Sequence, residues 1–183
     1  MAWGDIGNDL SLFFNEEKEV VEKKIERVEH HLAHLASAFY ASPYKEAACL
    51  SIDGFGDFKS TVSGFGKDSK IEIHHNVYFP HSLGLLYTAI TQFLGFWNYG
   101  DEYKVMGMAA WGNPRYEEKI SSLVSFDGSG DFKLDTDYFK HTAEGIAMEW
   151  ESGYPEIGQI FNFKITDLLG EYRSKDSKIT QYH

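Results

Sequence analysis

Three short apolar segments joined by tight turns constrain the fold of this chain more than any other feature of its sequence. They cover residues 46–53, 58–66 and 71–79, and the links between them are only residues 54–57 and 67–70. Links of this length join antiparallel neighbours, because a parallel connection needs a crossover of roughly a dozen or more residues. The sequence therefore predicts an antiparallel, three-stranded meander.

Helices are predicted before and after this meander along the chain. Residues 16–27 and 30–41 carry apolar side chains at helical spacing, and the Ser42-Pro43 pair ends the second of these helices. Ser82 is suited to cap a helix that runs through residue 94. The other elements expected are a strand at 25–29, a helix at 102–111, a helix from Pro114 to 123, a strand at 132–139 and a helix at 157–173. This order of elements favours an α/β or α+β layer fold.

The composition excludes several classes of function. The chain has 17 Lys and Arg against 28 Asp and Glu, a net charge of −11, which disfavours binding to nucleic acids or anionic membranes. No apolar run approaches the roughly 18 residues of a membrane span, and residues 1–10 do not resemble a signal peptide. Cys49 is the single cysteine and is expected to be a small buried strand residue. We therefore expect a cytoplasmic protein that binds neither nucleic acid nor membranes.

A pair of histidines is the strongest local sign of chemistry. His30 and His34 would lie on one face of a helix, one turn apart and close enough to share a metal ion. At about 100° per residue they point away from the apolar stripe of this helix, and the neighbouring His31 points elsewhere. The apolar stripe comprises Leu32, Leu35 and Phe39. A polar surface face would show the same spacing, so the pair alone leaves both interpretations open.

A glycine-rich turn bordered by carboxylates follows the first predicted strand. Asp53, at the strand end, would complete a set of two histidines and one carboxylate, which suits Fe(II), Mn or Zn. Gly54 and Gly56 let backbone N–H groups approach a phosphate, and Asp57 follows them. Gly and Asp are equally the ordinary residues of a plain hairpin turn. The turn by itself therefore does not decide between a binding loop and a simple reversal of the chain.

A second charged cluster opens the helix predicted at 102–111. Glu102 and Lys104 follow an aromatic loop and a glycine, and a helix start of this kind can hold an anion. Lys104 could meet a phosphate oxygen or a carboxylate there. The alternative is a capped amphipathic helix with solvated charges. The aromatic residues nearby either line a ligand pocket or belong to the core: Phe93, Phe96, Trp97, Tyr99 and Tyr103.

Three motifs in order resemble the nodulation-type O-carbamoyltransferases, a family that carbamoylates Nod factors, cephem antibiotics and aminoglycosides. The motifs are EHHLAHLASAF at 29–39, SIDGFGD at 51–57 and GDEYKVMGMA at 100–109. The resemblance implies an α/β domain of the actin-like ATPase (ribonuclease-H-like) type, similar to the tRNA threonylcarbamoyl-transferase fold. Such a domain would contain a mixed sheet, with the antiparallel three-stranded meander flanked by helices.

The resemblance also implies an ATP-dependent reaction. In the family, a C-terminal domain makes carbamoyladenylate from carbamoyl phosphate and ATP, and the N-terminal domain transfers the carbamoyl group to a hydroxyl of a sugar- or antibiotic-like acceptor. His30, His34 and Asp53 would be the catalytic metal ligands, for iron first and for manganese or zinc as alternatives. By the same resemblance, Gly54, Gly56 and Asp57 would border the carbamoyladenylate, and Glu102 and Lys104 would lie near the nucleotide.

The chain departs from the family at both ends. Family members begin with a short strand and a glycine-rich turn, which residues 1–11 do not resemble, and they continue well beyond residue 183. We therefore expect residues 1–183 to form a partial, incomplete N-terminal domain that lacks the carbamoyladenylate-forming domain and does not turn over carbamoyl phosphate alone. The alternatives are a piece of a threonylcarbamoyl-transferase-like or hydrogenase-maturation-type protein, or a non-catalytic binding module of the same fold.

Overall fold

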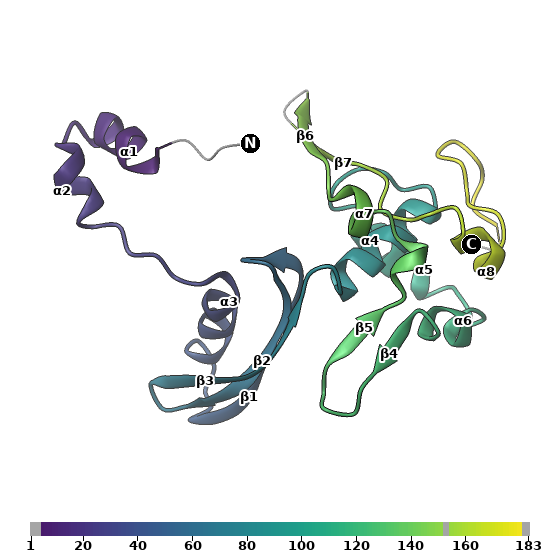
Figure 1. The fold of residues 1–183 in the computed structure, drawn as a ribbon, viewed down its shortest axis with the longest axis horizontal. Helices are drawn as coiled ribbons and strands as arrows, with labels where there is room; N and C mark the ends of the chain where they lie inside the picture. The colour runs from purple at the N-terminus through teal and green to yellow at the C-terminus, as the bar shows by residue number, and fades with distance from the viewer. Residues whose placement is uncertain (1–4, 152–153, 181–183) are drawn as a thin grey trace.

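The computed structural model describes residues 5–151 and 154–180. Figure 1 shows three parts along the chain: a helical hairpin, a sheet with one helix on it, and a mainly helical part that follows the sheet. The expectation that the chain does not start with a signal peptide falls partly on residues 1–4, which lie outside the described residues.

The predicted meander is confirmed. Strands β1 (Glu46–Gly56), β2 (Lys59–Lys67) and β3 (Lys70–Tyr78) pair in that order, and both pairings are antiparallel. β1 runs three residues beyond the predicted end at residue 53, through an irregularity between Ile52 and Gly56. The turn is therefore reduced to Asp57 and Phe58, which both have a positive φ, as two-residue hairpin turns that match the strand twist require.

Helix α3 (His30–Phe39), which the sequence predicted at residues 30–41, covers one face of this sheet. Its buried stripe comprises His31, Leu35 and Phe39. Leu35 and Phe39 pack on Cys49 of β1, which is buried as predicted. The expectation that Leu32 belongs to the stripe and His31 points elsewhere is wrong: Leu32 is only half-buried and His31 is fully buried. The reason is that the sheet offers His31 hydrogen-bond partners, so that burial costs the imidazole little.

A second core forms around helix α4 (Leu83–Phe93), whose N-cap is Ser82 as predicted. Phe161 and Ile165, from far along the chain, are fully buried in it. The other elements of this part are α5 (Glu102–Ala109), α6 (Glu117–Ser121), β4 (Val124–Phe126), β5 (Phe132–Leu134), the 3-10 helix η1 (Thr136–Tyr138), α7 (His141–Glu144), β6 (Met148–Glu151), β7 (Tyr154–Ile157) and α8 (Ile165–Leu169). β4 pairs with β5, and β6 with β7, as antiparallel hairpins.

The region before α3 differs from the prediction. Helix α1 (Ile6–Phe14) was not predicted, the helix expected at 16–27 is only α2 (Lys18–Glu22), and residues 25–29 form no strand. α1 and α2 pack on each other and lie away from the sheet, as Figure 1 shows. A strand needs a neighbour for its backbone groups, and residues 25–29 cross from this hairpin to α3 without one. Short helices depend on packing, and only Val21 of α2 is buried.

Three later elements are shorter than predicted. The strand expected at 132–139 stops at Leu134, because the Asp135 side chain caps the 3-10 helix that follows. Of the helix expected from Pro114 to 123, only α6 forms. The helix expected at 157–173 is reduced to α8, because the Gln92 side chain holds the preceding segment extended: it donates to Gly158 O and accepts from Ile160 N.

The mixed sheet expected from the resemblance is not formed by the described residues, whose strand pairs are all antiparallel. A parallel partner for β1 would have to return to the sheet, and α4 instead leads the chain into the second core. The structure is therefore a mixed helix-and-strand fold built on one three-stranded antiparallel sheet. Within the described residues, no helix is long and apolar enough to cross a bilayer.

Candidate metal centre

His30, His34 and Asp53 come together where α3 meets the end of β1. One potential ligand atom from each of the three lies within 4.8 Å of the others. His30 Nε2 lies 2.7 Å from Asp53 Oδ2 and 3.1 Å from His34 Nε2, and His34 Nε2 lies 3.5 Å from Asp53 Oδ2. The predicted helical spacing thus presents both imidazoles to the carboxylate, from an element that precedes it in the chain.

The three side chains fit a metal ion. Ligands at about 2.0–2.2 Å from a tetrahedral or octahedral ion lie about 3–3.5 Å from one another, close to the spacing of these atoms. Two imidazoles and one carboxylate are a donor set that suits Fe, Mn or Zn and leaves coordination positions open. The three side chains are between about one third and one half exposed, so that small molecules can reach them.

The carboxylate of Asp53 is held ready in its charged form. Burial alone would raise its pKa, but the hydrogen bond to the His30 ring, the bond from Gly54 N–H and the two nearby imidazoles outweigh burial, so that its pKa lies below the usual value. The Gly54 N–H donates to Asp53 Oδ1 at 2.6 Å, which leaves Oδ2 facing the histidines. A charged carboxylate is the form that binds a cation.

Two small residues let the site close up. A Cβ atom added to Gly56 would overlap the ring of His30, so that the approach of the imidazole to β1 depends on glycine at this position. A Cβ atom added to Gly84, in the first turn of α4, would likewise overlap the backbone of Asp53. The buried hydroxyl of Ser82 donates to Gly54 O at 2.6 Å and lies 3.1 Å from Asp53 O. The start of α4 therefore supports the end of β1 from the side of the second core.

The glycine-rich turn predicted around Asp53 is part of a strand, and its residues contact α3. Asp57 Oδ2 accepts the backbone N–H of His30 at 3.0 Å, and Glu29 accepts Leu32 N–H at 2.6 Å. Two carboxylates thus satisfy N–H groups at the start of this helix. Gly54 has open space beside its Cα. The expected contact of Gly54, Gly56 and Asp57 with carbamoyladenylate stays a prediction.

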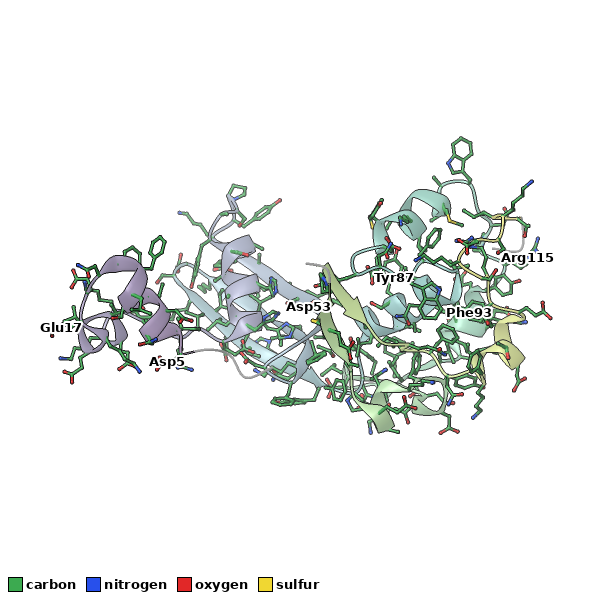
Figure 2. All side chains as sticks on the ribbon, turned by 90° about the horizontal axis from the view of Figure 1, so that it is seen from above. Asp5, Glu17, Asp53, Tyr87, Phe93 and Arg115 are labelled. Carbon is green, nitrogen blue, oxygen red and sulfur yellow. The ribbon has the colours of Figure 1, made fainter. Side chains whose placement is uncertain are left out.

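Glu102 and Lys104 lie on α5, separated from the histidines by α4. Glu102 Oε1 accepts the hydroxyl of Thr88 on α4 at 2.7 Å. Lys104 pairs with the buried Asp101 at 2.7 Å, and this hydrogen bond raises the pKa of the lysine. Among the described residues, the structure shows no hydrogen bond or ion pair between either side chain and His30, His34 or Asp53. Figure 2 shows Asp53 between α3 and the part of the molecule marked by Tyr87 and Phe93 on α4.

Only part of the aromatic residues near α5 belong to the core. Phe93 is buried in the second core, and Trp97 packs against it. Tyr99 and Tyr103 are exposed. The side chain of Phe96 lies beside charged groups, with Arg173 and Lys104 both over its ring.

Sequence reasoning missed two residues that support the site, His31 and Ser82. Ser82 was identified as a helix cap, but its bonds to the backbone of β1 could not be foreseen. His31 is the first residue of a buried stripe with a spacing of four, which a stripe defined only by apolar residues does not include. A buried helical stripe whose first residue is a histidine is the signal that would have found it.

Comparisons with known proteins agree with the motifs. The family described as carbamoyltransferase N-terminus matches residues 6–177. The nodulation protein NolNO of Sinorhizobium fredii is 44% identical over 98 residues, which are 52% of this chain and 14% of that protein. The nodulation protein NolO of Bradyrhizobium diazoefficiens is 38% identical over 111 residues, which are 59% of this chain and 20% of that protein.

An uncharacterized protein of Synechocystis is also similar, with 40% identity over 155 residues that cover 84% of this chain. The match covers 23% of that protein, so the chain spans less than a quarter of the length of these relatives. The family match extends over α1 to the segment after α8, and it includes the whole candidate site. The predicted family is therefore confirmed: the chain belongs to the carbamoyltransferase N-terminus family.

Proposed function

We propose that this chain is the carbamoyl-transfer part of an ATP-dependent O-carbamoyltransferase. The carbamoyl group would come from carbamoyl phosphate by way of carbamoyladenylate and pass to a hydroxyl of a sugar- or antibiotic-like acceptor. The observation that carries the proposal is the meeting of His30, His34 and Asp53 within 4.8 Å in a chain of this family. The family is named for carbamoyl transfer, which supports this reaction class.

The chemistry asked of the three residues is the holding of a divalent metal, with iron the first candidate and manganese or zinc the alternatives. A carbamoyl group is a poor electrophile because its nitrogen donates electrons into the carbonyl. The metal, when bound, supplies a Lewis acid for a carbonyl or phosphate oxygen. His30 and His34 would each present an imidazole lone pair, and Asp53 would supply the charge that its low pKa keeps available.

The proposal also assigns places to the adenylate and to the rest of the protein. Gly54, Gly56 and Asp57 would border carbamoyladenylate, and Glu102 and Lys104 would face the nucleotide from α5. The described residues would be part of an actin-like ATPase type domain, and a separate domain would form the adenylate. A cytoplasmic setting, in which ATP and carbamoyl phosphate are present, belongs to the same proposal.

The first test is the metal content of the purified chain, measured by mass spectrometry beside a His30→Ala/His34→Ala double variant. We expect close to one Fe, Mn or Zn per chain in the parent protein and loss of the metal in the variant. The matched control is a His74→Ala/His75→Ala double variant, which removes two exposed histidines of β3. Equal metal content in all three proteins would contradict the proposed site.

A second test uses a full-length protein that contains this domain. Asp53→Asn removes the charge but keeps the shape of the side chain. We expect it to abolish carbamoyl transfer to an acceptor, while pyrophosphate release from ATP, which reports adenylate formation elsewhere in the protein, continues. If Asp53→Asn retains both reactions, Asp53 takes no part in transfer.

A further inference from the structure

His31 is the one member of the histidine motif that does not face Asp53. Its side chain is fully buried between α3 and the sheet, at the end of the stripe that continues through Leu35 and Phe39. Its ring lies 5.1 Å from that of His30 and 6.3 Å from that of His34, centre to centre. It is thus in contact with the candidate site without offering it a ligand.

Both ring nitrogens of His31 are bound to the sheet. Nε2 lies 2.9 Å from Lys59 O of β2, and Nδ1 lies 2.9 Å from Ser51 Oγ of β1. A carbonyl oxygen only accepts, so Nε2 carries the proton and Nδ1 accepts from the Ser51 hydroxyl when the ring is neutral. The imidazole therefore has no lone pair left for a metal ion.

Together with the bond from the His30 N–H to Asp57, these two bonds fix the rotation and register of α3, which its apolar contacts leave free. Hydrophobic contacts such as those of Leu35 and Phe39 are non-directional, so a helix held by them alone can turn or slide on a sheet. Side-chain atoms at the rim of a helix lie about 6 Å from its axis, and a turn of about 15° moves them about 1.6 Å. Metal coordination tolerates errors of only about 0.2 Å.

The same bonds set the register of α3 on β1. Ser51 and Asp53 are two residues apart and therefore project from the same face of the strand, about 6.7 Å from each other. With His31 bound to Ser51, the neighbouring His30 and the next turn of the helix meet Asp53. A shift of α3 along the strand would instead take His30 and His34 away from Asp53.

We propose that His31 is the positioning residue of the candidate metal centre: its hydrogen bonds to Ser51 and Lys59 O hold α3 at the rotation and register in which His30 and His34 face Asp53. The inference rests on the proposed function for the identity of the group that the three residues hold. It extends that function to a residue outside the ligand set. Supporting residues of this kind typically change metal affinity by about 10- to 100-fold when they are replaced.

The test is a set of folded variants whose metal affinity is measured by titration calorimetry with Mn²⁺ or Zn²⁺. His31→Leu removes both hydrogen bonds and keeps an apolar side chain of similar length, and it should weaken affinity at least tenfold, in keeping with the usual effect of such residues. Ser51→Ala removes one bond and should have a smaller effect. His31→Gln can donate and accept, so it should restore part of the affinity lost in His31→Leu.

The matched control is His141→Leu, which removes another buried histidine, one that packs on Phe139 in the second core. It should cost stability as His31→Leu does but leave metal affinity unchanged. Affinity equal to the parent protein in folded His31→Leu would overturn the proposal, as would an equal loss in both variants.

A readout without metal separates this inference from the proposed function. The ¹⁵N shifts of the His30 ring report its hydrogen bond to Asp53, and they should change in His31→Leu but not in His141→Leu. If the parent protein binds no metal, the proposed function fails, and the shifts still decide on His31. Unchanged His30 shifts in His31→Leu would overturn the positioning role.

Discussion

At the residue scale, the closeness of His30 to β1 depends on the missing side chain of Gly56. A methyl group at this position would overlap the imidazole ring. Gly56→Ala should therefore push His30 away from Asp53 and weaken metal affinity about tenfold or more, measured by titration calorimetry. Gly54→Ala is the control, because it adds the same methyl group two residues earlier, where nothing lies within 4 Å. Equal affinities in both variants would show that the His30 ring can move aside without cost.

At the element scale, helix α3 is capped from outside, by the turn between β1 and β2. Asp57 accepts the His30 N–H, so Asp57→Ala leaves a helix-start donor without its partner. The loss of such a cap costs about 1 kcal/mol in the free energy of unfolding, measured by urea denaturation. Asp57→Asn keeps an accepting oxygen and should lose much less. An unchanged free energy of unfolding in Asp57→Ala would mean that water replaces the carboxylate at no cost.

At the scale of the whole molecule, the buried His141 and the half-buried His81 link stability to pH. Burial lowers the pKa of His81, with Lys133 adding to the effect, and burial lowers the pKa of His141 despite its bond to Pro80 O. Below the usual pKa of 6.5 these two side chains are protonated in the unfolded chain, whereas in the folded protein they stay neutral to a lower pH. Stability therefore rises with pH, and this contribution is lost as the pH falls below about 6.5.

Replacement of His141 tests this dependence. His141→Gln keeps a donor for Pro80 O but does not titrate, so its free energy of unfolding should fall less between pH 7 and pH 5 than that of the parent protein. His74→Gln, at an exposed position, should keep the parent slope. Denaturant titrations at several pH values measure both. Identical slopes in the parent and His141→Gln would exclude His141 as a source of acid sensitivity.

Local patterns made much of the site predictable. The short links around residues 57 and 68 predict the antiparallel meander, because no other pairing fits turns of that length. The spacing of four between His30 and His34 predicts that they share a helix face, and the Ser82 cap predicts the start of α4. The three motifs predicted the family, which the match over residues 6–177 confirms.

What the sequence by itself determined are thus the features set by neighbours within a few residues, namely turn geometry, helix faces and caps. The tertiary structure alone decided those that depend on partners far along the chain. Gln92 keeps residues 158–160 out of a helix from 66 and 68 residues away, and Asp57 caps a helix that begins 27 residues earlier. The burial of His31 belongs to the same class, because an imidazole enters a core only where the fold supplies a partner for each ring nitrogen.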